Sequence, residues 1–298
     1  MNSRILVSFT LLALIAGCGG GGGYSAPAPA PAPAAATVSS VGISNALYSQ
    51  TALITVNGAN LDKGLNVASA GCKAAPVIST AAPNVSTATT AYFTCTVAAV
   101  GAQTASVVRS SDGAALTTAA YTVDVPQVTF TTGNGAGVNG NIVITLEPAK
   151  APITTDNFLA YIKSGFYVNT AYHRSVSGFV VQGGGYAAPI SAAATPALKT
   201  TGAPITLEDG AGLSNLKYTV AMARTGSPDS ATSQFFINLV NNTFLDKTGT
   251  ARGYAVFGSV TTGTAVVDAM ATAPCSAAAY SECVPIPNIV ITAASQTR

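Results

Sequence analysis

The chain has 298 residues, of which 48% are hydrophobic and only 8% are charged, and its formal net charge is +2. Average domains carry about 25% charged residues, and nucleic-acid binders need clustered Lys and Arg to neutralise phosphates, so we expect no nucleic-acid partner. A single histidine and five cysteines leave little material for a catalytic zinc site, and we expect neither a metal nor a cofactor.

The first eighteen residues have the features of a bacterial export signal. Arg4 supplies a positive charge, and residues 5–16 are mostly apolar, which suits a signal segment but is too short for a membrane span of about 20 residues. The segment ends in LIAGC at Cys18, which resembles the lipobox of bacterial lipoproteins, whose cysteine is diacylated. We therefore expect a lipid anchor on Cys18; an ordinary signal peptide with an incidental cysteine is the alternative.

A linker is expected over residues 19–37, where a run of glycines precedes an Ala-Pro alternation. Glycines are flexible, whereas Ala-Pro repeats favour polyproline II and form a semi-rigid spacer. The predicted location is the cell envelope, with the folded part facing the periplasm. Gly19 stands in place of the Asp associated with inner-membrane retention in enterobacterial lipoproteins, which favours the outer membrane over the inner.

Residues 38–125 are rich in Thr, Val, Ala and Ser and contain short alternating runs. Strands are predicted at 52–58, 92–97, 105–109 and 121–125. Many short strands with intervening turn residues are typical of a β-sandwich. The stretch ITVNGANL, which begins at Ile54, resembles the opening of immunoglobulin-like IPT/TIG domains. We find no catalytic pattern here and interpret this domain as a spacer or adhesive module.

Residues 126–298 are predicted to contain many strands and only two helices, which favours a closed or nearly closed antiparallel barrel. The strands are expected at 141–147, 218–223, 234–239, 254–260 and 289–292, and a short helix at 265–270. Pro152 begins the other helix. Its pattern places the apolar residues Phe158, Tyr161 and Ile162 on one face of the helix. Asp156 is expected in the first turn, and Gly165 follows the end of the helix.

The sequence at residues 135–140, GAGVNG, matches the spacing GxGxxG. A dinucleotide site would need a strand before this motif and a helix after it. Because a strand pattern follows instead, we interpret it as a flexible turn before the first barrel strand.

Four cysteines remain if Cys18 is lipidated, and they form one local pair in each half of the chain. Disulfides persist in the oxidising compartments that exported proteins reach. We predict Cys72–Cys95 and Cys275–Cys283, since bridges between the two domains are less economical; free thiols are the alternative. These sulfurs are expected to be structural.

Three separated blocks carry the most specific pattern in the chain. Residues 166–185 are FYVNTAYHRSVSGFVVQGGG, residues 218–239 are YTVAMARTGSPDSATSQFFINL, and residues 244–258 are FLDKTGTARGYAVFG. In this order and spacing they resemble the cyclophilin family of peptidyl-prolyl cis-trans isomerases, most closely its exported bacterial members. The resemblance covers about residues 134–290. It implies a mainly β fold, with a cyclophilin-like closed barrel and two helices after the immunoglobulin-like sandwich, and polypeptide substrates that contain proline.

The residue types suit this chemistry, because rotation about an X-Pro bond breaks no covalent bond. Amide resonance imposes a barrier of about 18–20 kcal/mol, and a catalyst must favour the twisted amide over both planar forms. Twisting localises a lone pair on the prolyl nitrogen, toward which a guanidinium can direct an N–H group. The resemblance assigns this role to Arg174; a surface salt bridge is the alternative.

The resemblance also assigns the peptide-binding groove. Gln182 and Gln234 would contact the substrate through polar groups, and Ala223 and Arg224 would meet it through the backbone. The proline pocket and its surroundings would comprise Phe179, Val180, Phe236, Phe244, Leu245 and Tyr254. Ordinary core packing is the alternative for such an apolar set. Phe244 and Tyr254 replace the Trp and His of many eukaryotic members, so we expect weak cyclosporin binding.

His173 precedes the predicted catalytic arginine and invites a general-base role. Isomerisation requires no proton transfer, so we expect a structural role for it. Tyr172 and Ser177 depart from the commoner Phe and Pro around this position. The Ala-rich segment 186–217 is longer than in compact members and is expected to shape access to the groove.

The leading hypothesis is a lipid-anchored isomerase that helps envelope proteins to fold. The alternative is a peptide-binding chaperone or scaffold in which catalysis is incidental. A third hypothesis gives residues 38–125 a structural role in attachment to a surface partner.

Overall fold

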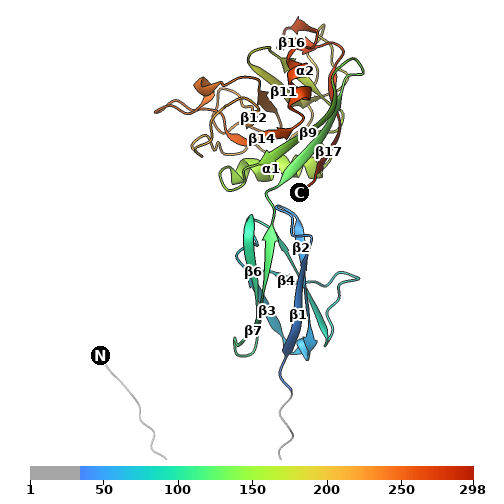
Figure 1. The fold of residues 1–298 in the computed structure, drawn as a ribbon, viewed down its shortest axis with the longest axis vertical. Helices are drawn as coiled ribbons and strands as arrows, with labels where there is room; N and C mark the ends of the chain where they lie inside the picture. Colours follow the sequence, from blue (N-terminus) through green and yellow to red (C-terminus); the bar gives the residue numbers. More distant parts are fainter. Residues whose placement is uncertain (1–33) are drawn as a thin grey trace, which may run out of the picture. The chain divides into compact units, whose positions relative to one another are not determined.

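The computed structural model describes residues 34–298 (Figure 1). The predicted signal segment, its Cys18 and most of the predicted linker lie outside these residues, so the lipid anchor stays a prediction. Neither helix within residues 34–298 has the length and apolar character that a membrane span needs.

Residues 37–123 form two antiparallel sheets (Figure 1). In spatial order, one sheet contains β1 (Thr37–Ser44), β2 (Thr51–Ala59), β5 (Thr90–Thr96) and β4 (Val77–Ile78), and the other contains β3 (Leu65–Ser69), β6 (Gly101–Arg109) and β7 (Ala115–Val123). Alternate residues of both sheets meet in one core, among them Ile54, Phe93, Val67 and Val107. The two predicted sheets of a sandwich are therefore present, and their immunoglobulin-like classification stays a prediction. A relationship to IPT/TIG domains stays a prediction.

The predicted strands of this region correspond to β2, β5, β6 and β7, whereas β1, β3 and β4 were not predicted. The sequence of β1, TVSSVGIS, contains small polar residues and none of its residues is fully buried, so hydrophobic alternation is weak. The strand β4 has only two residues, both exposed. Such strands are held by pairing with their neighbours rather than by their own pattern.

Residues 127–296 contain a closed antiparallel barrel and two helices, which confirms the predicted fold class. The barrel follows the order β10-β11-β13-β12-β14-β9-β8-β17. In chain order its strands are β8 (Gln127–Gly133), β9 (Asn139–Leu146), β10 (Thr170–Ser175), β11 (Val180–Ala187), β12 (Thr219–Met222), β13 (Phe235–Asn238), β14 (Val256–Thr262) and β17 (Ile289–Gln296). The other elements are α1 (Pro152–Lys163), the short 3-10 helix η2 (Thr243–Leu245), α2 (Thr264–Ala271), β15 (Cys275–Ala278) and β16 (Ser281–Pro285).

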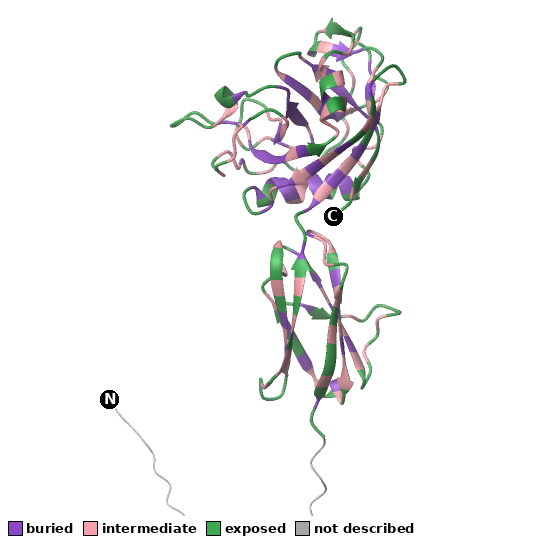
Figure 2. Ribbon diagram, in the orientation of Figure 1, coloured by how far each residue is buried: buried purple, intermediate pink, exposed green. Residues whose placement is uncertain are grey.

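Aromatic side chains fill the barrel interior, and buried residues alternate with less buried ones along β9 (Figure 2). Phe130, Phe158, Tyr167 and Phe235 are fully buried, and the ring centroids of each pair lie 5.2 to 6.0 Å apart. Rings at these distances and angles attract one another beyond the area that they bury. The barrel is therefore a packed core, and its binding surface must lie on the outside.

The helix predicted from Pro152 is α1, and its buried face contains Phe158, Tyr161 and Ile162 as expected. Gly165 follows the end of the helix with a φ of +71°, a conformation that glycine adopts without strain. The placement of Asp156 in the first turn was wrong, because Pro152–Thr155 form that turn and none of them is acidic. A carboxylate from a distant segment takes this position instead, as described below.

One local prediction agrees with the structure in part. The GxGxxG segment forms a turn and the first two residues of β9, but the unpredicted strand β8 precedes it, so the turn does not lie before the first barrel strand. The Asn134 side-chain oxygen accepts hydrogen bonds from the Ala136 and Val138 N–H groups in this turn. The disulfides Cys72–Cys95 and Cys275–Cys283 are both present, one in each part of the chain.

Candidate active site

A row of paired residues crosses five barrel strands. Arg174 on β10 lies opposite Gln182 on β11, and Gln182 lies opposite Phe236 on β13. Phe236 in turn lies opposite Ala221 on β12, which lies opposite Val256 on β14. Directly paired residues of antiparallel strands point to the same side of the sheet. The barrel therefore aligns a guanidinium, an amide and an apolar cluster on one face.

Alternation along β13 explains why Phe236 faces this side. Its neighbours Phe235 and Ile237 belong to the barrel core, whereas Phe236 belongs to a separate cluster with Val180 and Val256. Successive side chains of a strand point to opposite faces. Two adjacent phenylalanines thus have different functions, one inside the barrel and one beneath the outer surface.

A bulge in β10 turns Arg174 outward. The pairing of β10 with β11 shifts between Tyr172 and Arg174, so that His173 is the extra residue. In a regular strand Tyr172 and Arg174 would share a face, but a bulge changes the direction of the side chains that follow it. Tyr172 is consequently fully buried in the barrel core, whereas the Arg174 side chain is 21% exposed.

These residues surround a pocket of about 100 Å³ on the barrel surface. Its lining residues were all predicted from the sequence: Arg174, Phe179, Val180, Gln182, Ala223, Arg224, Phe236, Leu245 and Tyr254. The Phe236 and Tyr254 rings pack edge to face with centroids 5.5 Å apart. A small apolar pocket with a few polar groups at its rim is the usual form of a ligand site. The structure brings these residues together, and their individual roles stay predictions.

Two predicted residues lie beside the pocket rather than in its lining. The Gln234 side-chain oxygen accepts a hydrogen bond of 3.0 Å from Gln182 Nε2, so the two amides are already paired. The Phe244 ring stacks on Phe179 with centroids 5.9 Å apart and is 72% exposed. Phe244 therefore extends the apolar surface at the pocket rim.

The Arg174 guanidinium lies at the polar edge of the pocket. Its Cζ is 5.2 Å from the centroid of the Phe179 ring, a cation–π distance. Its Nη2 donates hydrogen bonds of 3.1 and 3.0 Å to the two carboxylate oxygens of Glu282 on β16. Glu282 was not predicted from the sequence, because it lies 108 residues from Arg174 and outside the three motif blocks.

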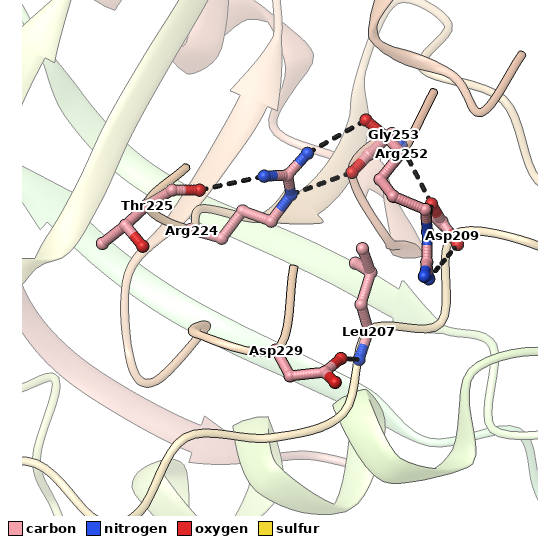
Figure 3. Close-up of polar contacts among 7 residues, drawn as sticks. All are labelled: Leu207, Asp209, Arg224, Thr225, Asp229, Arg252 and Gly253. Carbon is pink, nitrogen blue, oxygen red and sulfur yellow. Dashed lines mark hydrogen bonds and ion pairs between the residues drawn. The ribbon is translucent and has the colours of Figure 1, made fainter. Parts of the chain in front are cut away.

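The guanidinium of Arg224 is occupied by backbone carbonyls (Figure 3). Its Nε donates to the Gly253 oxygen at 3.0 Å, its Nη2 to that of Arg252 at 3.0 Å and its Nη1 to that of Thr225 at 2.9 Å. The guanidinium also lies 4.6 Å from the centroid of the Tyr254 ring. Arg224 therefore holds the pocket wall together: all three of its guanidinium nitrogens donate to backbone carbonyls, whereas Arg174 donates to Glu282 through Nη2 alone.

Two carboxylates that the sequence analysis missed support this wall (Figure 3). Asp209 accepts two hydrogen bonds of 2.8 Å from Arg252 and one of 2.9 Å from the Gly253 N–H. The hydrogen bond from Arg252 lowers the pKa of Asp209, although burial opposes this shift. Asp229 accepts a hydrogen bond of 2.8 Å from the Leu207 N–H. Asp209 therefore fixes the long segment that precedes β12 against the loop before β14, and Asp229 fixes the same segment against the loop between β12 and β13.

His173 is buried and lies behind Arg174. Burial, and then the positive charge of Arg174, lower the pKa of His173 to about 4, so its imidazole is neutral at pH 7. Its ring packs edge to face on Tyr186 with centroids 4.8 Å apart, and Nδ1 has no hydrogen-bond partner among the described residues. These features agree with the structural role that we expected.

A larger cavity of about 500 Å³ lies in the sandwich, lined in part by Leu61, Leu65 and Phe93. Asp62 is the single charged residue in its lining, and no second titratable group faces it. The smaller barrel pocket is therefore the candidate active site, because it combines apolar residues with a cation and an amide group, whereas the lining of the sandwich cavity contains no cation.

Comparisons with known proteins match the part of the chain that forms the barrel. The model of the family described as "Cyclophilin type peptidyl-prolyl cis-trans isomerase/CLD" matches residues 127–296. The chain is 48% identical over 160 residues to the peptidyl-prolyl cis-trans isomerase cyp18 of Streptomyces antibioticus, covering 52% of this chain and 92% of that protein. It is 47% identical over 146 residues to a peptidyl-prolyl cis-trans isomerase of Acinetobacter baylyi, covering 49% and 74%. A crystal structure of a cyclophilin type isomerase from Cryptosporidium parvum aligns with a TM-score of 0.46 at 23% identity, covering 58% and 98%.

Proposed function

Because this chain belongs to the cyclophilin type peptidyl-prolyl cis-trans isomerase family and is a peptidyl-prolyl cis-trans isomerase, we propose a catalytic residue for it. The proposed residue is Arg174. The supporting observation is the Arg174 guanidinium beside Phe179 in the lining of an apolar pocket. The proline ring of the substrate occupies the pocket between Phe236 and Leu245. The amide group of Gln182 holds the substrate backbone next to Arg174.

In this mechanism Arg174 acts on the bond that rotates. As the X-Pro amide twists, resonance is lost and the prolyl nitrogen gains a localised lone pair. An N–H group of Arg174 donates to this nitrogen, and the hydrogen bond is strongest in the twisted state. Each 1.4 kcal/mol or so of such differential stabilisation accelerates rotation about tenfold. No covalent bond forms or breaks, so neither a nucleophile nor a base takes part.

We expect Arg174→Ala in the full chain to lower kcat/KM for a proline-containing peptide by about 100-fold, the typical loss on removing one preorganised donor. Arg174→Lys retains the charge but loses the planar fork of donors, so its activity should be intermediate. Arg109→Ala, which removes an arginine paired with Asp112 in the sandwich, is the control and should be fully active. An Arg174→Ala enzyme within twofold of wild type would contradict the proposal.

The same variant separates catalysis from a chaperone role. If Arg174→Ala assists the refolding of a proline-limited client protein as well as wild type does, peptide binding rather than isomerisation is the useful activity. If assistance falls together with kcat/KM, catalysis is the function.

We also propose that the protein is an exported lipoprotein whose substrates are unfolded segments of envelope proteins. The lipobox-like sequence at Cys18 supports the anchor, and two disulfides suit an oxidising compartment. Radiolabelled fatty acid should label the wild-type protein and not Cys18→Ala, and globomycin should block processing. An unlabelled, freely secreted wild-type product would refute the anchor.

Weak cyclosporin binding is proposed for the same groove. Phe244 has an exposed ring without an indole N–H group. Tyr254, which replaces the histidine, packs its ring against Phe236 in the pocket lining. We expect inhibition of the isomerase only at high cyclosporin concentration, and tighter inhibition of the Phe244→Trp variant. Equal inhibition of both proteins would show that the missing donor at position 244 is not the cause.

A further inference from the structure

Glu282 is the acidic neighbour of the proposed catalytic arginine. Both of its carboxylate oxygens accept from the same nitrogen, Nη2 of Arg174, at 3.1 and 3.0 Å. Among the residues that the structure describes, no other side chain or carbonyl hydrogen-bonds this guanidinium. The Nη1 and Nε groups of Arg174 therefore remain available for a substrate while Nη2 is held.

The hairpin that carries Glu282 is firmly attached to the barrel. The strands β15 and β16 pair with each other, and the disulfide Cys275–Cys283 joins them next to Glu282. Val284 is fully buried in a cluster with Ala171 of β10 and Ile190.

Further contacts fix both the tip and the base of this hairpin. Near the tip, Tyr280 donates a hydrogen bond of 2.8 Å from its hydroxyl group to the Ser191 carbonyl oxygen. At the base, the Ile286 N–H donates to the Pro274 oxygen at 2.8 Å. The backbone of Glu282 is therefore held in place by the contacts of the hairpin, although the Glu282 side chain is 66% exposed.

We propose that Glu282 is a positioning residue that holds the Arg174 guanidinium in its catalytic orientation. An arginine side chain has several rotatable bonds, and fixing it in one rotamer costs conformational entropy. The contact with Glu282 fixes one end of the guanidinium before the substrate arrives, so less freedom is lost when the twisted amide binds. This inference rests on the proposed catalytic role of Arg174.

The test compares Glu282→Ala and Glu282→Gln with wild type in the full chain. Exposed ion pairs are weak, so we expect Glu282→Ala to lower kcat about two- to fivefold, with KM little changed. Glu282→Gln keeps an acceptor oxygen of the same reach and should recover part of this loss. Asp268→Asn, which removes an exposed ion pair with Lys217 outside the pocket, is the matched control and should be unaffected.

Salt and a double variant show whether the effect passes through Arg174. Because salt screens exposed charges, the ratio of wild-type to Glu282→Ala kcat should fall toward one as salt approaches 1 M. Glu282→Ala should have no further effect in an Arg174→Ala background. A fully active or more active Glu282→Ala variant, an unchanged ratio in high salt, or an additive loss in the double variant would overturn the inference. A fully active Arg174→Ala variant would instead overturn the catalytic role of Arg174 itself.

Discussion

At the scale of single residues, the surroundings of a side chain set its charge and therefore its role. His173 and Arg174 are adjacent in sequence, yet one is buried and neutral at pH 7 and the other reaches the pocket with its charge. Burial disfavours the protonated imidazole, and the neighbouring guanidinium disfavours it further. A buried neutral histidine supports the strand, whereas the partly exposed arginine is able to meet a substrate.

This neutral histidine predicts a pH dependence of stability. The unfolded chain protonates His173 below about pH 6.5, but the folded protein does so only near pH 4. Between these values the unfolded state binds more protons, so the free energy of unfolding falls as the pH falls, by about 3 kcal/mol in all. Urea unfolding from pH 7 to 4.5 should show this loss in wild type and a flatter profile in His173→Gln.

We compare how steeply the free energy of unfolding changes with pH in wild type and in His173→Gln. A cavity or strain that the substitution introduces lowers this free energy at every pH and leaves the slope unchanged. Carboxylates whose pKa is lowered in the folded state, such as Asp209, lose their contribution mainly below about pH 4. They therefore do not obscure the histidine effect above pH 4.5. Parallel profiles for the two proteins would exclude His173 as the source of the pH dependence.

At the scale of secondary-structure elements, α1 obtains its N-terminal cap from a distant segment. The Glu208 carboxylate accepts hydrogen bonds from the Ile153 and Thr154 N–H groups at 3.1 and 2.8 Å and from the Thr154 hydroxyl at 2.7 Å. These N–H groups have no partner within the helix, and a negative charge is favoured at this end. The segment that contains Glu208 is thereby fixed to the helix that covers the barrel core.

Removal of this cap should destabilise the protein measurably. We expect Glu208→Ala to lower the free energy of unfolding by about 1–2 kcal/mol, the range found for lost caps, and Glu208→Gln to cost less. Urea unfolding at pH 7 measures both changes. Glu282→Ala serves as a control, because its exposed ion pair should contribute less than about 1 kcal/mol. Equal losses for Glu208→Ala and this control would contradict the capping role.

The strength of the local sequence pattern explains why some helices and strands were predicted and others were not. The strands β2, β5, β9 and β13 and the helix α1 have strong periodicity or start signals, and each was expected within about two residues of its place. The strands β10 and β11 lie in the motif blocks but were not predicted as strands, since β11 contains three glycines and β10 contains a bulge. Asp156 was wrongly assigned to the first turn, because the helix begins at Pro152 and its first turn ends at Thr155; the carboxylate at this end of the helix comes from Glu208.

At the scale of the whole molecule, all of the pocket residues come from the barrel, and the sandwich contributes none of them. The disulfide Cys72–Cys95 lies within the sandwich and closes a loop with a sequence separation of 23. Cross-linking a loop of this length stabilises a fold by about 3 kcal/mol, mainly by restricting the unfolded chain. The stability of the sandwich and the activity of the barrel should therefore respond separately to its removal.

We expect the double variant Cys72→Ala/Cys95→Ala to unfold at a lower urea concentration, because its free energy of unfolding should be about 3 kcal/mol smaller than that of wild type. Its kcat/KM in the absence of urea should stay at the wild-type value. Unfolding followed by tyrosine fluorescence, together with a peptide isomerisation assay, measures both properties. A large loss of activity in the folded double variant would show that the sandwich contributes to catalysis.

The sequence alone sufficed for whatever depends on nearby residues or on a specific motif. It identified the β-rich class, the helix at Pro152, the two local disulfides and the residues that line the pocket. Alternation and the start and end signals of a helix act over a few residues, so they can be recognised before the fold is known. The disulfide partners lie only 23 and 8 residues apart, and the pocket residues were identified through the family resemblance.

The folded chain was needed for the orientation of these residues and for their partners. Barrel closure and the bulge at His173 turn Arg174 away from the core. Closure also brings Glu282 to Arg174 and Asp209 to Arg252 across separations of 108 and 43 residues. Such contacts depend on which strands pair and in what register, and a single charged residue carries no sequence pattern that identifies its eventual neighbour.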